Sequence, residues 1–264
     1  MQTSLKAIAQ KAVNDKKHRF GNLYGVLNKD TLRSAFYRLN KKSAAGVDRM
    51  TVIEYQKNLD ENLENLIQRL KEKKYKAKLV RRVFIPKGQG KLRPLGIPCL
   101  EDKIVQQVCA DILMSIWNGL FISSNFGYRP NTSAKDAVKE LSRKMLYGKY
   151  RYVVEADIKG FFDNLNHEWL YRMLEERIYD KAFLQLISKW LKAGILNEGS
   201  VEHPVKGSPQ GGVISPVLAN IYLHYVLDMW FEKAVKPNCT GEAYICRYAD
   251  DCAPRRRRYV AKAA

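Results

Sequence analysis

The sequence has 264 residues, 46% hydrophobic and 28% charged, a composition that excludes an intrinsically disordered chain and allows a sizeable buried core. It contains no apolar run long enough to cross a membrane, no secretory signal at Met1–Lys17, and five cysteines without the paired spacing of a zinc site, which favours reduced thiols. The formal net charge of +19 points to a polyanionic partner.

The positive charge is concentrated at the start of the chain. Residues 1–100 hold 23 Lys and Arg against 8 Asp and Glu, whereas residues 101–251 hold 18 against 19. Because a one-sided excess of this size repels itself without a partner, we expect the first part to bind nucleic acid. The candidate contacts are Lys41, Lys42, Lys73 and Lys74. A lysine-rich surface that serves only solubility is the alternative.

Two helices are predicted in this basic region. Asp30–Lys42 has apolar residues at helical spacing, and Asp30 can cap its first turn. Thr51 and Glu54 have the pattern of a capping box, and the amphipathic pattern behind them continues to about Lys73.

A β-hairpin follows, and after it helices alternate with strands. The hairpin consists of Leu79–Ile85 and Leu92–Ile97, joined by a turn rich in glycine and lysine. The further predicted helices are Glu101–Trp117, Thr132–Tyr147, His167–Ile178, Lys181–Leu196 and Pro216–Ala234, and the further predicted strands are Tyr152–Ala156 and Ala243–Tyr248. Strands separated by helices predict a mixed α/β or α+β core rather than a helical bundle, and we expect the α+β class.

The first candidate catalytic residue follows the strand Tyr152–Ala156. Alternation places Val153, Glu155 and Asp157 on one face, so Asp157 leaves a largely apolar strand at its end. A carboxylate in this position can bind a metal ion. Taken alone, an aspartate that caps a helix or a turn is the more common explanation.

A pair of adjacent carboxylates, Asp250 and Asp251, follows the strand Ala243–Tyr248. Neighbouring strand residues point to opposite faces, so the two can converge only at a tight turn, where a divalent cation would offset their repulsion. An ordinary exposed turn is the alternative. Together with Asp157, however, the pair supplies carboxylates from separate strands, as two-metal phosphoryl transfer requires.

Six segments, in order, resemble blocks of the group II intron-encoded reverse transcriptases, which include maturases. They are Lys42–Asp48, similar to the N-terminal extension of that family; Ile85–Pro98, similar to its fingers hairpin; Phe126–Pro130, another shared segment; Glu155–Asp163, similar to its first palm motif; Ser208–Pro216, similar to its template- and nucleotide-facing loop; and Tyr248–Asp251, similar to its catalytic hairpin. The resemblance covers about residues 30–251. It implies right-hand polymerase fingers and palm, with an antiparallel sheet packed on helices and the thumb absent.

The resemblance also implies the metal ligands. Asp157, Asp250 and Asp251 would be the catalytic residues and, with the backbone carbonyl of Ile158, would hold two Mg²⁺ ions, for which Mn²⁺ can substitute. One ion would activate the attacking 3′-hydroxyl, and the other would steady the triphosphate and its leaving group.

Four nucleotide-binding residues are implied in the same way. The ring of Phe162 would lie under the sugar and select deoxynucleotides, Gln210 would lie over the incoming nucleotide, and Lys87 and Arg93 would close over the triphosphate. A core phenylalanine, a turn glutamine and solvated hairpin charges are the respective alternatives. Arg129 would contact the template backbone or, equally, serve as a structural arginine.

The end of the sequence departs from the resemblance. The family continues with an apolar strand that completes the catalytic hairpin, whereas here Pro254 precedes four arginines. Because proline cannot donate to a β-ladder and an arginine run is poor strand material, we expect the turn at Asp250 and Asp251 to fray, and residues 252–264 to form an atypical basic tail. Polymerisation by such a fingers–palm fragment would be weak or absent.

The leading hypothesis is an RNA-directed DNA polymerase that binds an RNA template, intron RNA, a DNA or RNA primer and dNTPs. It would work in the bacterial cytoplasm, associated with RNA or the nucleoid and with no membrane. The expected organisation is an N-terminal extension with basic fingers at 1–100, a fingers–palm catalytic region at 101–251, and the tail. The alternatives are a maturase that binds intron RNA without polymerising, and a retron, defence or diversity-generating reverse transcriptase. A homodimer is compatible with each.

Overall fold

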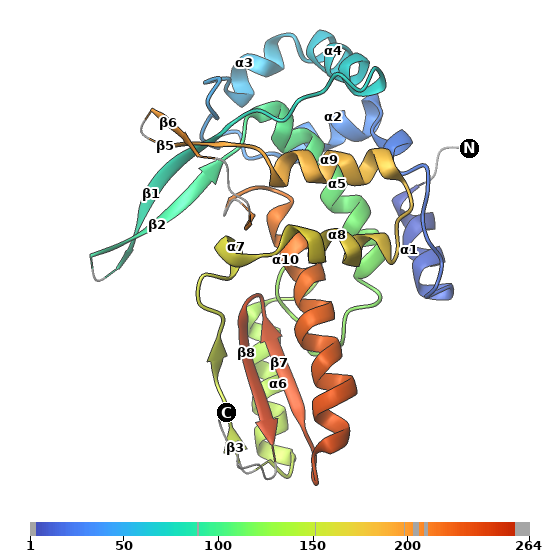
Figure 1. The fold of residues 1–264 in the computed structure, drawn as a ribbon, viewed down its shortest axis with the longest axis vertical. Coiled ribbons are helices and arrows are strands. Elements are labelled where there is room, and N and C mark those ends of the chain that lie inside the picture. The colour runs from blue at the N-terminus through green and yellow to red at the C-terminus, as the bar shows by residue number, and fades with distance from the viewer. Residues whose placement is uncertain are drawn as a thin grey trace.

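The computed structural model describes residues 4–88, 90–150, 152–197, 199–202, 206–208 and 211–256, without the side chains at 87, 88, 91 and 252–256. Most helices gather at one end of an elongated molecule, and a small sheet with two long helices forms the other end (Figure 1). The α+β fold predicted from the sequence is confirmed.

Five short helical elements form the N-terminal part. They are α1 (Leu5–Asn14), η1 (Tyr24–Val26), α2 (Lys29–Arg38), α3 (Val52–Lys57) and α4 (Leu59–Lys71). The predicted capping box is confirmed, because the Thr51 hydroxyl accepts from the Glu54 amide and the Glu54 carboxylate accepts from the Thr51 amide. The predicted cap of α2 was wrong: Asn28, not Asp30, accepts the first amides, because a cap residue precedes the helix.

The predicted hairpin is confirmed as β1 (Val80–Gly88) and β2 (Lys91–Ile97). β1 also pairs in parallel with β5 (Ile195–Asn197), which pairs with β6 (Ser200–Glu202). We call this four-stranded unit, in the order β2-β1-β5-β6, the hairpin sheet. The helix predicted to reach Leu196 was therefore wrong at its end, since α9 (Lys181–Leu191) stops earlier and pairing with β1 outweighs the local apolar pattern.

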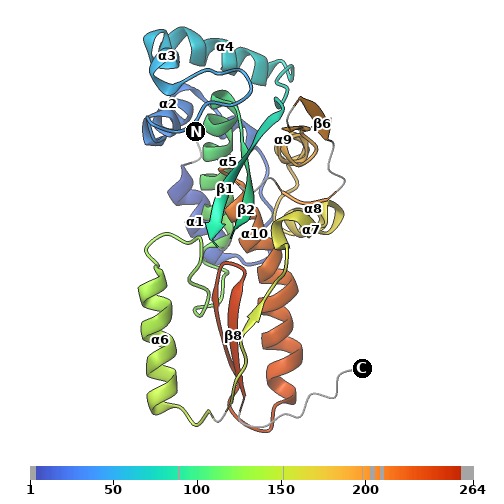
Figure 2. The ribbon, with the colours of Figure 1, turned by 90° about the vertical axis from the view of Figure 1, so that its left-hand side faces the viewer.

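The second sheet carries the three aspartates, and we call it the aspartate sheet. Its central strand β8 (Asp251–Arg256) pairs antiparallel with β7 (Tyr244–Tyr248), and also with the short strands β3 (Tyr152–Val153) and β4 (Ala156–Asp157). The strand predicted at 152–156 is thus interrupted at 154 and 155. Figure 2 shows β8 between α6 (Ala134–Tyr147) and the long helix that begins with α10 (Ser215–Leu223).

The expectation that the chain would not pair after Asp251 was wrong. The pairing of β8 with β7 extends from Asp251 opposite Tyr248 to Arg255 opposite Tyr244. It includes Pro254, which lies opposite Ile245. Along an antiparallel strand, successive amides point toward opposite neighbouring strands. Asp251, which pairs with Tyr248 across the turn, faces β7, so the Pro254 nitrogen, three residues further on, faces β3 and β4, where their pairing with β8 is interrupted. The missing donor therefore removes no ladder hydrogen bond, and the turn does not end in a frayed tail.

A continuous apolar core joins the helices of the helical end with α10, and a second, smaller cluster of Phe231, Ala243 and Ile245 lies beside the aspartate sheet. α5 (Leu100–Trp117) runs through the centre of the larger core and is buried along its whole length (Figure 1). Three more helices, α7 (Phe161–Asn164), α8 (His167–Glu175) and α9, contribute to the larger core. The predicted long helix is confirmed, because α10 continues through the π-helical segments η2 (His224–Asp228) and η3 (Phe231–Val235) before the short η4 (Lys236–Asn238).

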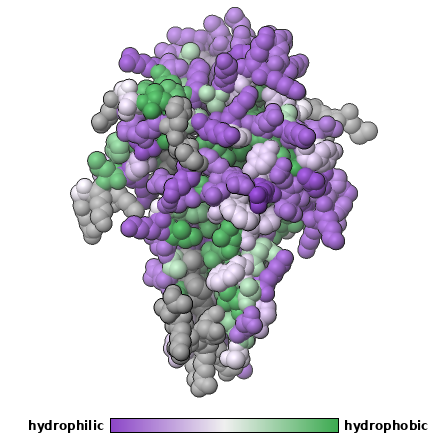
Figure 3. All heavy atoms as spheres, in the orientation of Figure 1, coloured by the Kyte–Doolittle hydropathy of each residue, from purple (hydrophilic) through white to green (hydrophobic). Residues whose placement is uncertain are grey.

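The surface in Figure 3 is hydrophilic over most of the helical end, with apolar side chains concentrated toward the narrower end. Among the described helices, none combines the length and hydropathy needed to cross a membrane. The thiols at Cys99, Cys109 and Cys239 are free.

Asp102 is an unexpected charge inside the core. Asp102 is only 3% exposed. Its carboxylate accepts hydrogen bonds from the Tyr75 hydroxyl and, at 3.2 Å, from the Lys78 amide. Burial raises the pKa of Asp102 to about 6, because these hydrogen bonds and the charge of Lys78 offset only part of the desolvation. The start of α5 is thereby tied to the segment that leads into β1.

We expect this carboxyl group to make the protein less stable as the pH rises. The pKa of Asp102 is higher in the folded than in the unfolded state, so its contribution is complete below about pH 4 and is lost as the pH rises through about 6. Relative to Asp102→Asn, wild type should lose roughly 2–3 kcal/mol of unfolding free energy between about pH 4 and pH 7.5. Urea denaturation of both proteins measures this change, and a pH-independent difference between them would contradict it.

Candidate active site

Two of the three predicted carboxylates lie side by side on adjacent strands of the aspartate sheet. Asp157 ends β4 and Asp251 begins β8, and the register of these antiparallel strands places the two residues directly opposite. Directly opposed residues project from the same face, with their Cβ atoms about 4.5–5.5 Å apart. Tyr248 of β7, which lies opposite Asp251 on the other side, continues the same row.

The third carboxylate lies in the two-residue turn Ala249–Asp250 between β7 and β8. Ala249 is buried and has φ 58°, a left-handed value that is unfavourable for residues with a side chain. A positive φ at the first central residue matches the type II′ turn, whose twist suits a hairpin. The tight turn predicted for the adjacent aspartates is confirmed.

The carboxylates lie close enough to interact. Partial burial raises the pKa of Asp251, and the negative charges of Asp250, Asp157 and Glu155 raise it further. Three acidic side chains therefore act on the carboxyl group of Asp251. A bound cation would oppose this repulsion.

The residues suit a divalent metal ion in their chemistry. Carboxylate oxygens are the ligands that Mg²⁺ prefers, and the carbonyl of Ile158 directly follows Asp157 in the chain. Within the described residues, no three His, Cys, Asp or Glu side chains converge closely enough to hold a metal ion. Asp157 and Asp251 are exposed, so their carboxylates are accessible to an ion from solvent.

A buried ion pair lies behind the turn. Arg247, on β7, donates from Nε and Nη2 to the two carboxylate oxygens of Asp228 at 2.7 and 2.6 Å, and both side chains are completely buried. Burial alone would raise the pKa of Asp228, but the hydrogen bonds and charges of Arg247 and His224 lower it. The sequence analysis missed this pair, because the two charges lie on separate elements and belong to no motif.

The loop that includes the shared segment Phe126–Pro130 lies against the turn. The Phe126 amide donates to the Arg247 carbonyl and the Arg247 amide to the Ser124 carbonyl, so this loop runs alongside β7. A Cβ atom at Gly127 would lie 1.9 Å from the Ala249 nitrogen, so a side chain there would displace the turn.

Tyr128 brings an aromatic ring to the carboxylates. Burial raises the pKa of Tyr128, and so do the nearby charges of Asp250 and Asp251, while Arg93 lowers it. Tyr128 directly follows Gly127, which packs against the turn, and the charge of Arg93 reaches the Tyr128 hydroxyl. Arg93 was assigned to the triphosphate from the sequence, whereas Tyr128 was given no role. The available signal was an aromatic residue directly after a glycine in a segment that carries the resemblance.

Phe162 lies in the wall of a cavity of about 150 Å³ beside the hairpin sheet. Its ring is buried and packs edge-on against Phe161, with the centroids 5.4 Å apart. Arg82 and Lys206 line the same cavity, as does the acidic residue Asp163. The two cations were missed by the sequence analysis, because neither belongs to the segments that suggested a nucleotide site.

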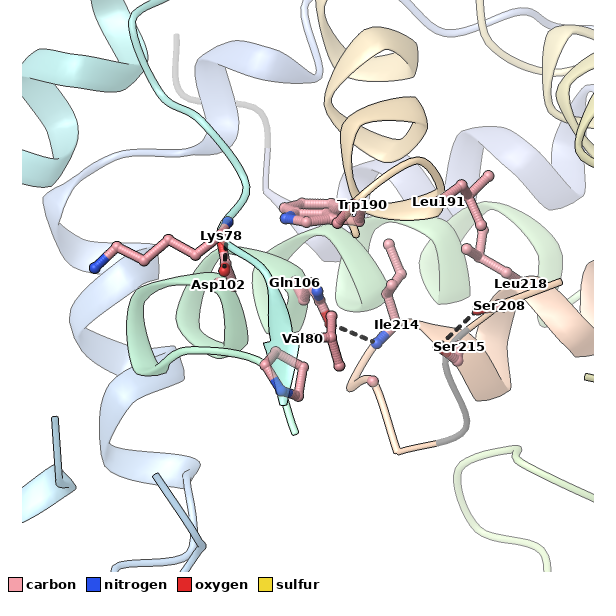
Figure 4. Close-up of a pocket in the computed structure, with 13 residues that line it drawn as sticks. Lys78, Val80, Asp102, Gln106, Trp190, Leu191, Ser208, Ile214, Ser215 and Leu218 are labelled. Carbon is pink, nitrogen blue, oxygen red and sulfur yellow. Dashed lines mark hydrogen bonds between the residues drawn. The ribbon is translucent and has the colours of Figure 1, made fainter. Parts of the chain in front are cut away.

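The ends of the loop from 208 to 215 are fixed (Figure 4). The Ser208 hydroxyl donates to the Ser215 hydroxyl at 2.8 Å, and the Ile214 amide lies 3.5 Å from the acceptor oxygen of Gln106 on α5. Gly211, with φ 111°, lies against β2, where an added Cβ would be 2.7 Å from the Gly96 oxygen. The loop thus meets the hairpin sheet.

Two implied nucleotide-binding residues lie outside the described part of the chain. They are Gln210 and the side chain of Lys87, and their roles stay predictions.

The contacts of Arg129 favour the structural alternative. Its guanidinium donates to the Asn118 side chain and to the carbonyls of Asn118, Ile122 and Asn125, and it lies over the Phe121 ring at 5.6 Å. A template contact would have to compete with these interactions.

The predicted RNA-binding lysines lie at the helical end of the molecule, away from the aspartate sheet (Figure 1). Lys41, Lys42, Lys73 and Lys74 are all exposed, and Lys74 pairs with Glu72 at 2.8 Å. Nucleic-acid contacts at these lysines would therefore be distinct from the carboxylate site.

Comparison with known proteins gives a consistent picture. Residues 85–253 match the family described as reverse transcriptase (RNA-dependent DNA polymerase). Group II intron-encoded protein LtrA of Lactococcus lactis subsp. cremoris is 40% identical over 190 residues, which is 69% of this chain and 31% of LtrA. Protein YkfC of Escherichia coli (strain K12) is 35% identical over 234 residues, covering 78% of this chain and 61% of YkfC.

Solved structures show the same fold. A chain of a partial Cas6-RT-Cas1–Cas2 complex matches with a TM-score of 0.53 and 23% identity, over 90% of this chain and 39% of that one. The chain thus spans less than two thirds of each of these longer proteins.

We expect Mn²⁺ to stabilise the fold through the three aspartates. Ligands that bind only the folded state raise stability by RT ln(1 + [L]/Kd), about 2.7 kcal/mol at 100 Kd. Thermal melts with increasing Mn²⁺ should show a rise for wild type that Asp157→Asn and Asp251→Asn largely abolish. Glu168→Gln, an exposed acid on α8, is the control and should respond like wild type. Equal responses of all four proteins would exclude the site.

Proposed function

The chain belongs to the reverse transcriptase family, among the group II intron-encoded proteins, and from this we propose that it is an RNA-directed DNA polymerase that uses two divalent metal ions. The proposed substrates are an RNA template, a DNA or RNA primer and dNTPs. The observation that carries the proposal is the placement of Asp157 opposite Asp251, with Asp250 in the adjoining turn. Carboxylates from two separate strands meet on one face, as the chemistry requires.

The roles of the carboxylates follow from their arrangement. When bound, the two ions would activate the primer 3′-hydroxyl and stabilise the charge that develops on the triphosphate. Asp157 and Asp251, on adjacent strands, would hold an ion between them, and Asp250 would contribute from the turn. The pairing of β8 with β4 and β7 fixes their backbones before substrate arrives, which lowers the cost of orientation during the reaction.

The cavity beside Phe162 suits the incoming nucleotide. An aromatic ring in its wall can exclude a sugar that carries a 2′-hydroxyl, and the cations Arg82 and Lys206 can attract a triphosphate. Arg93, whose charge reaches Tyr128, would act with them. These side chains orient the nucleotide, whereas the aspartates position the reacting groups.

Primer extension on an RNA template with dNTPs and Mg²⁺ tests the polymerase function. We expect low but template-dependent incorporation by wild type, in keeping with the weak polymerisation expected from the sequence. Asp157→Asn should lose roughly 100-fold or more of it, because removing a metal ligand costs several kcal/mol of transition-state stabilisation. Absence of incorporation above the Asp157→Asn level on every template and primer tried would refute the proposal.

The same assay tests the selection of the sugar. Phe162→Ala should raise the use of rNTPs relative to dNTPs by roughly 10-fold or more, because shape exclusion in a pocket is worth about 1–3 kcal/mol. The matched control is Phe161→Ala, which removes a neighbouring buried ring that packs toward Tyr222 instead of lining the cavity. If both variants left the rNTP/dNTP ratio unchanged, Phe162 would be a core residue only.

A second function, binding of structured intron RNA in the manner of a maturase, is favoured by the exposed lysines at the helical end. Lys41, Lys42 and Lys73 lie apart from the carboxylates, on the part of the chain with the largest positive excess. RNA held there would leave the aspartate sheet accessible. We place the protein in the cytoplasm with RNA as its partner. The alternative of a retron, defence or diversity-generating enzyme would be decided by the absence of intron RNA beside the gene.

RNA binding should be strongly salt-dependent. Each phosphate neutralised releases counterions, with a slope of roughly −0.7 to −0.9 in log K against log salt. Replacing Lys41, Lys42, Lys73 and Lys74 by Gln should weaken binding and reduce the slope, with Lys74 contributing least because Glu72 already pairs with it. Asp250→Asn should bind RNA like wild type. An affinity that stays constant between about 50 and 200 mM salt would contradict an electrostatic RNA site.

A further inference from the structure

The peptide that links Ala249 to Asp250 is hydrogen-bonded from inside the protein. Arg247 Nη1 donates to the Ala249 carbonyl at 3.0 Å, two residues along the chain. The same nitrogen donates to Asn220 Oδ1 at 2.9 Å. The guanidinium thus reaches back under the turn that carries Asp250 and leads into Asp251.

Asp228 fixes this guanidinium in place. Two hydrogen bonds of 2.7 and 2.6 Å join Arg247 to both carboxylate oxygens, and neither residue is exposed to solvent. A bidentate pair sets the plane of the guanidinium as well as its position. Since Asp228 lies on the π-helical segment η2, the orientation of the turn is set by the long helix behind the sheet.

Asn220 extends the support to the loop on the other side of the turn. Its amide donates to the Gly127 carbonyl at 2.9 Å, and its oxygen also accepts from Asn125 at 2.9 Å. Gly127 in turn lies against the Ala249 nitrogen. The turn is therefore held by a hydrogen bond to its carbonyl and by close packing against its amide.

The turn needs such support for two reasons. Ala249 has a backbone conformation that is unfavourable for a residue with a Cβ, and such strain persists only where the surroundings impose it. In addition, the adjacent carboxylates of Asp250 and Asp251 repel each other. Both forces would move the turn away from its present shape.

We propose that Arg247 is a positioning residue of the active site: held by Asp228 and Asn220, it fixes the Ala249–Asp250 peptide so that the carboxylates of Asp250 and Asp251 are kept in a metal-binding arrangement. The inference rests on the proposed function in taking these aspartates as metal ligands. It adds that the metal affinity of these aspartates is set by a buried cation that contacts neither metal nor substrate.

The test compares two buried arginines. Arg247→Lys keeps the charge but cannot bond Asp228 through two nitrogens and also reach the Ala249 carbonyl. Arg177→Lys is the matched control: Arg177 is also buried, and it donates to the carbonyls of residues 12, 15, 16 and 18 in the N-terminal part of the chain, on other elements than the turn. Mn²⁺ affinity is measured by electron paramagnetic resonance, and primer extension is measured against Mn²⁺ and dNTP concentration.

We expect Arg247→Lys to raise the Mn²⁺ dissociation constant about tenfold or more and to lower kcat with little change in KM for dNTP, with partial rescue at high Mn²⁺. The melting temperature of Arg177→Lys should fall by an amount comparable to that of Arg247→Lys. Its Mn²⁺ dissociation constant should nevertheless stay within about twofold of the wild-type value. Equal Mn²⁺ affinities of the two variants would overturn the proposal. If Arg247→Lys does not fold, Asp228→Asn, which keeps an acceptor oxygen but loses the charge, takes its place with the same expectations.

The outcomes separate this inference from the polymerase function. Weakened Mn²⁺ binding in Arg247→Lys, with no incorporation by wild type, would support the positioning role and refute the polymerase. If wild type incorporates fully and Arg247→Lys and Arg177→Lys are equally active at every Mn²⁺ concentration, the polymerase function is supported and the positioning role is refuted. A wild-type protein that neither binds Mn²⁺ nor polymerises would refute both.

Discussion

The pairing of strand β8 is the interaction on which the site depends. β8 lies between β7 on one side and the interrupted pair β3 and β4 on the other, so one strand draws together segments that are far apart in the chain. Through this pairing Asp157 and Asp251 come face to face, and the turn beside them has a defined shape. The carboxylates are exposed, and their common position comes from backbone hydrogen bonds, because burial contributes little to holding them.

The helix α5 connects this sheet with the rest of the molecule. At its first turn, Asp102 is bonded to the segment before β1, and near its last turn, Asn118 accepts hydrogen bonds from Arg129. Apolar residues bury nearly all of the length between. The hairpin sheet and the aspartate sheet are therefore attached to opposite ends of one rigid element, which limits how far the cavity beside Phe162 can shift relative to the carboxylates.

Much of this arrangement was predictable from local patterns. The capping box at Thr51, the hairpin of β1 and β2 and the long helices follow from spacing and turn residues. The turn at Asp250 follows from strand alternation, because two adjacent acids can converge only where the strand turns. Features that depend on distant partners were not predictable. Pro254 is tolerated only because the adjoining strand is interrupted where the proline lies, Ile195 becomes a strand because β1 is beside it, and Arg247 finds Asp228 through the fold alone. None of these pairings can be recognised from a short stretch of the sequence, because the partners are far apart in the chain.

The contact between Gly211 and Gly96 has an evolutionary consequence. With only 2.7 Å between a Cβ at 211 and the Gly96 oxygen, the loop and the hairpin sheet meet through bare backbone. Any mutation that adds a side chain at position 211 must be accompanied by a change in the path of β2, and a single substitution cannot supply both. Sequence drift at this junction is thus confined to coordinated changes at the two glycines and the backbone around them.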